Sequence, residues 1–114
     1  MRKVYLLTCA LLFLMGALPA QVTVTGLVSF GSEDGPEIPG WPVEVWSAED
    51  GNLLNAGETD EQGHYELLID LAAGTETTIS VRTPDLCTGD LLEFLVDVGA
   101  GDTEIEANFV ICEG

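Results

Sequence analysis

The sequence TDEQGHY, from Thr59 to Tyr65, lies between two segments that alternate apolar and polar residues. It contains two carboxylates and the only histidine of the chain, so a catalytic or metal-binding cluster has to be considered. Turn geometry accounts for the same residues, because Asp60 accepts backbone hydrogen bonds and Gly63 adopts positive φ in a type I turn with a glycine bulge. Tyr65 then starts the inward face of the next strand and His64 points outward. The stretch therefore predicts a tight turn between two strands.

Strict alternation of apolar and polar residues recurs through the chain after residue 20. Such alternation is typical of strands with one buried face. The predicted strands span residues 22–30, 42–47, 53–59, 64–71, 77–83, 91–98 and 103–111. Glycine, proline and acidic residues fill the loops, and no window shows the 3.6-residue apolar period of a helix. The sequence predicts an all-β domain, a seven-stranded antiparallel Greek-key β-sandwich.

The alternation also predicts which residues face the core. They are Val22, Val24, Val28 and Phe30; Val43 and Val45; Tyr65, Leu67, Ile69 and Leu71; Ile79 and Val81; Phe94, Val96 and Val98; and Ile105, Ala107, Phe109 and Ile111. Gly26 falls on the inward face too, where a glycine often marks a bulge or a close approach of another backbone segment.

Residues 1–20 have the layout of a secretory signal peptide, with a basic start, an apolar run from Val4 to Leu18 and small residues before the cut. The run is short for a membrane span, which needs roughly 20 apolar residues. We expect cleavage between Ala20 and Gln21; a cut after Ala17 and an uncleaved anchor are the alternatives. Residues 21–114 then form one small domain without a membrane span, secreted or held in the bacterial periplasm or at the cell surface.

The exported domain is strongly acidic. All 20 acidic residues follow position 20, and Arg82 is the one basic residue left after cleavage, so the formal charge becomes −19. Nucleic acids and anionic lipids are repelled by such a charge, which excludes both as partners. The charge also opposes compaction of the chain itself.

Carboxylates are the oxygen ligands that calcium prefers in extracellular modules. The candidates are Glu33, Asp34 and Glu37 in the loop at 31–40, or Asp60 and Glu61 in the turn. No spacing matches the twelve-residue calcium loop, and a solvated acidic surface explains the same residues. The prediction is that no cofactor is needed, with calcium as the alternative.

Two cysteines, Cys87 and Cys112, remain after cleavage. In an oxidising compartment they have one pairing available, a disulfide with each other. The segment GAGD at 99–102 predicts an antiparallel hairpin of the strands 91–98 and 103–111, which places residue 112 near Cys87. Strand pairing and compartment both favour the bridge.

The turn also occurs within a longer pattern. VTVTGLV at 22–28, GPEIPGWPVEVW at 35–46 and Thr-Asp-x-x-Gly-x-Tyr together resemble the carboxypeptidase regulatory-like domain and the related B-type repeats of bacterial surface proteins. The resemblance covers about residues 22–71 and implies a transthyretin-like β-sandwich, in which these residues shape turns and core. The residues that carry it are Gly26, Gly40, Val43, Val45, Thr59, Asp60, Gly63 and Tyr65. Domains of this family are usually appended to a larger protein.

Enzymes with related sandwich folds need side chains that this sequence lacks. Hydroxyisourate hydrolases use several histidines, and intradiol dioxygenases bind iron through paired tyrosines and paired histidines, whereas His64 and Tyr65 stand alone after cleavage. No catalytic residue is predicted. We expect a non-enzymatic module with a structural or interaction role in adhesion or as an accessory domain. Its protein or glycan partner and its oligomeric state are left open.

Carbohydrate binding is the alternative function. Trp41 and Trp46 would form a platform on which sugar rings stack, as in related starch-binding-like sandwiches. The competing interpretation is that Trp41 caps the edge of the core and Trp46 covers a sheet face. Exposure of both rings separates the two interpretations.

Overall fold

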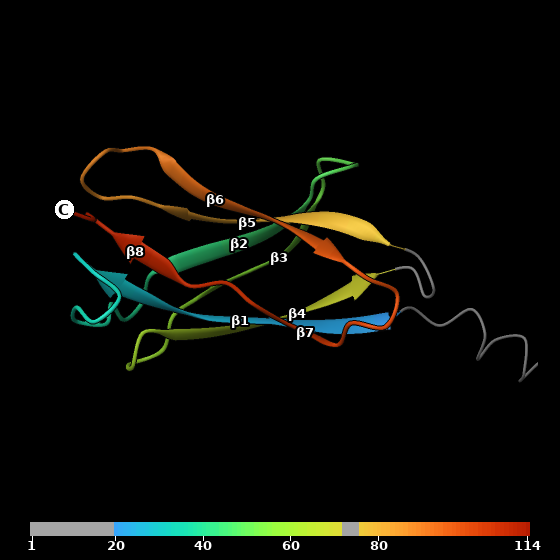
Figure 1. The fold of residues 1–114 in the computed structure, drawn as a ribbon, viewed down its shortest axis with the longest axis horizontal. Coiled ribbons are helices and arrows are strands. Elements are labelled where there is room, and N and C mark those ends of the chain that lie inside the picture. The colour runs from blue at the N-terminus through green and yellow to red at the C-terminus, as the bar shows by residue number, and fades with distance from the viewer. Residues whose placement is uncertain (1–19, 72–75) are drawn as a thin grey trace, which may run out of the picture.

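The computed structural model describes residues 20–71 and 76–114 as two packed β-sheets (Figure 1). The strands are β1 (Ala20–Phe30), β2 (Pro42–Ser47), β3 (Leu53–Glu58), β4 (His64–Leu71), β5 (Thr77–Pro84), β6 (Leu91–Val98), β7 (Glu104–Glu106) and β8 (Phe109–Ile111). The predicted all-β sandwich is confirmed. The predicted leader lies outside the described residues, apart from Ala20, which begins β1. No helix among the described residues has the length and apolarity that crossing a bilayer demands.

One sheet is built around β1. This strand pairs antiparallel with β4, from Ala20 opposite Leu71 to Leu27 opposite His64. Its other pairings, with β7 and β8, are parallel, so the sheet is mixed rather than purely antiparallel as predicted. The second sheet is antiparallel throughout, in the order β3-β2-β5-β6.

The predicted last strand, 103–111, is divided into β7 and β8. Both pair with β1 in the same register, with Val24 opposite Ile105 and Val28 opposite Phe109. Between β7 and β8 the backbone ladder is interrupted. There the Asn108 side chain accepts the hydrogen bond from the Leu27 amide at 2.9 Å. The sequence thus predicted one strand where the structure has two, because a side-chain acceptor can interrupt a ladder without changing the alternation.

The predicted hairpin of residues 91–98 and 103–111 is wrong. The turn at 99–102 does form, with the Asp102 amide donating to the Gly99 carbonyl at 3.1 Å. However, β6 pairs with β5, and the chain after the turn crosses to the other sheet and runs beside β1. Alternation specifies which side chains face inward, and it does not specify the neighbouring strand.

The inward-facing predictions agree with the core except at two aromatic residues. The residues buried between the sheets are Val22, Val24, Val28, Val43, Val45, Tyr65, Leu67, Ile69, Ile79, Val81, Val98, Ile105, Ala107, Phe109 and Ile111. Phe30 is 44% exposed at the end of β1, and Phe94 is 45% exposed on β6. The inner side of β6 is therefore left partly open by the opposite sheet.

The predicted disulfide between Cys87 and Cys112 is confirmed, with the two Cα atoms 5.2 Å apart. Cys87 lies in the loop between β5 and β6, and Cys112 follows β8. The bridge therefore joins the two sheets instead of two neighbouring strands of one hairpin, which corrects the reason given for it from sequence.

Candidate functional site

The Thr59–Tyr65 stretch is a turn whose residues serve the fold. The Asp60 carboxylate accepts hydrogen bonds from the amides of Gln62 at 2.9 Å and His64 at 3.0 Å, and Gly63 has a φ of 75°. The predicted turn chemistry is confirmed. The strands it joins, β3 and β4, belong to different sheets, so the turn carries the chain across the sandwich.

Thr59 connects the loop before β2 to this turn through hydrogen bonds. Its buried hydroxyl accepts a hydrogen bond from the Trp41 amide at 2.8 Å and donates one to the Ile38 carbonyl at 2.5 Å. The carbonyl of Thr59 also accepts a hydrogen bond from the Gly40 amide at 3.0 Å. These contacts give the spacing of the motif a structural role.

Tyr65 crosses the core at Gly26. Its ring packs where a side chain at position 26 would be, and its hydroxyl donates a hydrogen bond to the Ala107 carbonyl. Burial, assisted by the negative charge of Glu106, raises the pKa of the Tyr65 phenol well above its usual value. The phenol is therefore a neutral hydrogen-bond donor that closes the gap between β7 and β8, where the strand ladder is interrupted.

A Tyr65→Phe variant is expected to lose about 1–2 kcal/mol of unfolding free energy at neutral pH, because the Ala107 carbonyl is left without its donor. The raised pKa adds a pH dependence. The unfolded chain loses the phenolic proton from about pH 10, whereas the folded chain keeps it, so stability falls as pH rises above about 10. Urea titrations between about pH 9 and 11 should show this fall in the wild type and a smaller one in the variant.

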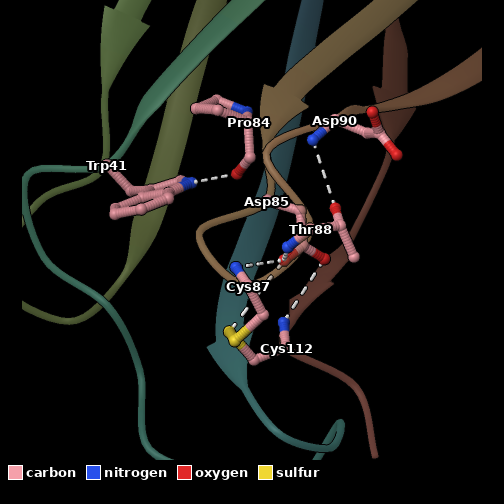
Figure 2. The surroundings of a disulfide bond; sticks show 7 residues. All are labelled: Trp41, Pro84, Asp85, Cys87, Thr88, Asp90 and Cys112. Carbon is pink, nitrogen blue, oxygen red and sulfur yellow. Dashed lines mark hydrogen bonds between the residues drawn. A yellow bond between two sulfur atoms is a disulfide. The ribbon is translucent and has the colours of Figure 1, made fainter.

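The disulfide is surrounded by hydrogen bonds to one buried carboxylate (Figure 2). Asp85 accepts from the amides of Cys87 at 2.9 Å and Cys112 at 3.4 Å, through different oxygens. The two sulfur atoms and this carboxylate lie within 4.8 Å of one another. Because the sulfurs are bonded to each other, they offer no thiolate to a metal, and the cluster is a structural link between the loop and the chain end.

The two tryptophans have different surroundings. Trp41 packs against the core, and its indole nitrogen donates to the Pro84 carbonyl at 3.0 Å (Figure 2). Trp46 lies on the outer face of the second sheet, half-buried, with the Arg82 guanidinium carbon 5.2 Å from its ring centroid. Trp41 thus caps the core edge and Trp46 covers a sheet face, as the competing interpretation predicted. Stacking of sugar rings on a platform formed by both tryptophans stays an untested prediction, and these contacts do not support it.

The carboxylates proposed for calcium do not converge. Among residues 20–71 and 76–114, the groups of three candidate ligands that lie close together do not include Glu33, Asp34, Glu37, Asp60 or Glu61. Glu58, Asp60, Glu66 and Glu106 instead line a shallow hollow beside the turn, together with His64. Calcium binding therefore stays a prediction, which a larger thermal shift with calcium than with equal magnesium would support.

Arg82 forms the one ion pair found in the described part of the chain, with its Nε 3.2 Å from Glu93 Oε2. The Ser80 hydroxyl donates to the same carboxylate at 2.5 Å. This hydrogen bond, followed by the hydrogen bond and the charge of Arg82, lowers the pKa of Glu93. Among the described residues, the remaining acidic side chains form no ion pair with a basic one.

Added sodium chloride is expected to raise the thermal midpoint of the domain. Between about 10 mM and 150 mM salt the Debye length falls from about 30 Å to about 8 Å, which screens repulsion among exposed carboxylates. Differential scanning calorimetry at matched pH measures the shift. A midpoint that does not respond to salt would mean that self-repulsion contributes little to stability.

The most unusual surface lies along β6. Leu91 is 58% exposed and Leu95 64% exposed on its outer side, and Phe94 is 45% exposed on its inner side. Beside Phe94 a hollow opens between β6 and β8, and Phe109 and Val110 of β8 also line it. The Phe94 and Phe109 rings lie 5.1 Å apart between centroids. Sequence reasoning missed this surface, although the apolar residues on both faces of LLEFLVDV were a signal for it.

The fold is shared with parts of known oxygenases. No family model matches the sequence, and no curated protein matches it either. Among solved structures, a dioxygenase domain from Streptomyces sp. SirexAA-E, part of a fusion with a carbohydrate-binding protein, is similar with a TM-score of 0.55 and 16% identity over 84% of this chain and 82% of that one. A 9R-lipoxygenase from Cyanothece PCC8801 is similar with a TM-score of 0.51 and 16% identity over 80% of this chain, which spans 16% of the lipoxygenase. At this identity the likeness shows the fold alone.

Proposed function

We propose that the protein is a non-enzymatic exported β-sandwich module that binds another protein in the bacterial envelope. The observation that carries the proposal is the run of exposed apolar side chains on β6, at Leu91, Phe94 and Leu95. Exposed apolar surface rimmed by polar residues marks interaction sites, and β6 exposes such surface on both faces, with Leu91 and Leu95 outward and Phe94 inward. The other exposed large apolar side chains of the described residues, Phe30, Leu53, Leu68 and Leu86, lie one to an element or loop, whereas β6 carries three.

The side chains that dioxygenase chemistry would need have other roles here. The Tyr65 phenol is buried and donates to the Ala107 carbonyl, while its neighbour His64 points away on the exposed face of β4. Adjacent residues of a strand face opposite sides, so the two cannot ligate one metal ion together. This placement supports a binding role over an enzymatic one despite the oxygenase-like fold.

Export is supported by the disulfide between Cys87 and Cys112, since such bridges form and persist in oxidising compartments. Assignment to the carboxypeptidase regulatory-like domains is part of the proposal. Two observations support this assignment: the Tyr65 ring packs against Gly26, and Asp60 holds the turn by hydrogen bonds. Both give residues of the shared motif a role in the fold.

The test is capture of the partner with matched surface variants. The exported domain, a Leu91→Ser/Leu95→Ser variant and a Leu53→Ser control are used to capture native envelope proteins, and each captured protein is purified and its affinity measured by biolayer interferometry. Leu53 is 47% exposed on β3, at the opposite edge of the same sheet. The β6 variant should weaken binding by about tenfold or more and the control should not. A partner that binds all three equally, or no partner, would contradict the proposal.

A further inference from the structure

One edge of β6 carries no neighbouring strand in the described part of the chain. Its other edge is paired with β5 through eight consecutive residues, from Leu91 opposite Pro84 to Val98 opposite Thr77, without a register shift. The free edge therefore presents backbone N–H and C=O groups in a regular row. Such a row is a template for an additional strand.

The usual protections of an edge strand are missing from β6. Its sequence, LLEFLVDV, has no lysine, no proline and no bulge, which are the features that discourage pairing with another chain. Its two carboxylates are held by β5, because Glu93 bonds to Ser80 and Asp97 accepts from the Thr78 hydroxyl at 2.8 Å. Both carboxylates thus have partners on β5, and Glu93 also lines the hollow beside Phe94.

A hollow lies beside Leu92, Glu93 and Phe94, near the start of β6. Phe94 of one sheet packs against the buried Phe109 of the other, with 5.1 Å between ring centroids, and keeps almost half of its surface exposed to the hollow. A strand added to β6 would point alternate side chains toward this hollow. Filling it would complete the open side of the sandwich.

Charge decides between the possible occupants. Glu33 and Glu113 line the same hollow, and the sequence has 20 acidic residues against 3 basic ones. A second copy of this chain would bring the same negative charge to the edge and be repelled. A segment with lysine or arginine beside an apolar residue is attracted to the carboxylates and fits the hollow.

We propose that β6 binds an extended basic segment of another protein by strand addition, with one apolar side chain of that segment packed on the exposed side of Phe94. This inference rests on the proposed function and names the binding edge and the chemistry of the partner. Main-chain hydrogen bonds supply affinity in this mode, and the hollow and the carboxylates supply selectivity.

A synthetic peptide tests the proposal directly. It alternates lysine and valine around a central phenylalanine and matches the eight residues of β6 in length. Two further versions carry N-methyl groups on the odd or on the even residues, so each lacks the N–H groups of one edge and keeps its charge. Calorimetry at physiological salt should show binding of the parent and of one methylated version, and about tenfold or greater loss for the other.

Protein variants complete the test. Glu33→Gln with Glu113→Gln should weaken peptide binding several-fold, whereas Glu61→Gln with Glu66→Gln removes the same charge elsewhere and should not. Equal binding of the two methylated peptides would show attraction by charge alone and overturn strand addition. Absence of peptide binding, or a dimer of the protein in sedimentation velocity that the Phe94→Ala variant abolishes, would overturn it too. If the peptide test fails but a native partner still depends on Leu91 and Leu95, the proposed function stands without strand addition. If the peptide test fails and no native partner depends on these residues, both proposals are overturned.

Discussion

A Gly26→Ala variant is expected to lose about 3 kcal/mol or more of unfolding free energy, at the upper end of what overpacking a core costs. A Cβ atom at position 26 would lie 1.9 Å from the Ala107 carbonyl oxygen and 2.6 Å from Cε1 of the Tyr65 ring. The carbonyl belongs to the backbone, so it cannot move aside as a flexible side chain would. Relief of the clash requires the segment between β7 and β8 to move away from β1, which also breaks the hydrogen bond from Tyr65.

Gly101→Ala is the matched control, because a Cβ there meets nothing within 4 Å. Its stability should stay within about 0.5 kcal/mol of the wild type. Urea denaturation of both variants, followed by tryptophan fluorescence, measures the difference. Equal midpoints for the two variants would show that the backbone near Ala107 adjusts freely and that Tyr65 does not depend on Gly26.

The role of Gly26 illustrates what sequence reasoning could reach. Its inward position in an alternating strand predicted a bulge or a close backbone approach, and the second of these is what the structure contains. The approaching atom, the Ala107 carbonyl oxygen, could not be predicted. It comes from the far end of the chain, and alternation carries no information about which strand lies beside which.

The same limit explains the errors near the C-terminus. A hairpin of residues 91–98 and 103–111, and the observed crossing to the other sheet, both place Ile105, Phe109 and Ile111 in the core. The pattern is therefore compatible with either topology, and the shorter connection was preferred. The Cys87–Cys112 pair was nevertheless predicted correctly, because two cysteines in an oxidising compartment allow one pairing whatever the strand order.

The candidate surface was missed for a related reason. Alternation placed Phe94 on the inward face of β6, and its side chain does lie beside Phe109 of the other sheet. Whether an inward residue is covered depends on how far the opposite sheet extends, which local sequence does not state. The outward residues Leu91 and Leu95 were the readable signal, since a strand that is apolar on both faces at a surface indicates a contact still to be made.

Replacing Cys87 and Cys112 together by serine is expected to lower the unfolding free energy by roughly 3 kcal/mol, from the entropy that the unfolded chain regains. The bridge closes a loop with a sequence separation of 25, which holds β6, β7 and β8. Cys87 is exposed and Cys112 is partly buried, so serine fits at both positions and the loss reports the cross-link rather than a cavity. Chemical denaturation with and without reductant measures the loss. Reductant should lower the unfolding free energy of the wild type to that of the variant and leave that of the variant unchanged.

The position of the bridge predicts where the loss appears first. β8 has three residues and pairs with β1 alone among the described strands, while the amide of Cys112 is held by Asp85 across the sandwich. Without the cross-link, opening of β8 requires only this short ladder and the burial of Phe109 and Ile111 to be given up. Hydrogen exchange in the double variant should therefore accelerate more at Val110 and Ile111 than at Leu67 in β4. Uniform acceleration along the chain would mean that the two sheets separate as one unit and that the bridge stabilises the whole sandwich instead of fastening its last strand.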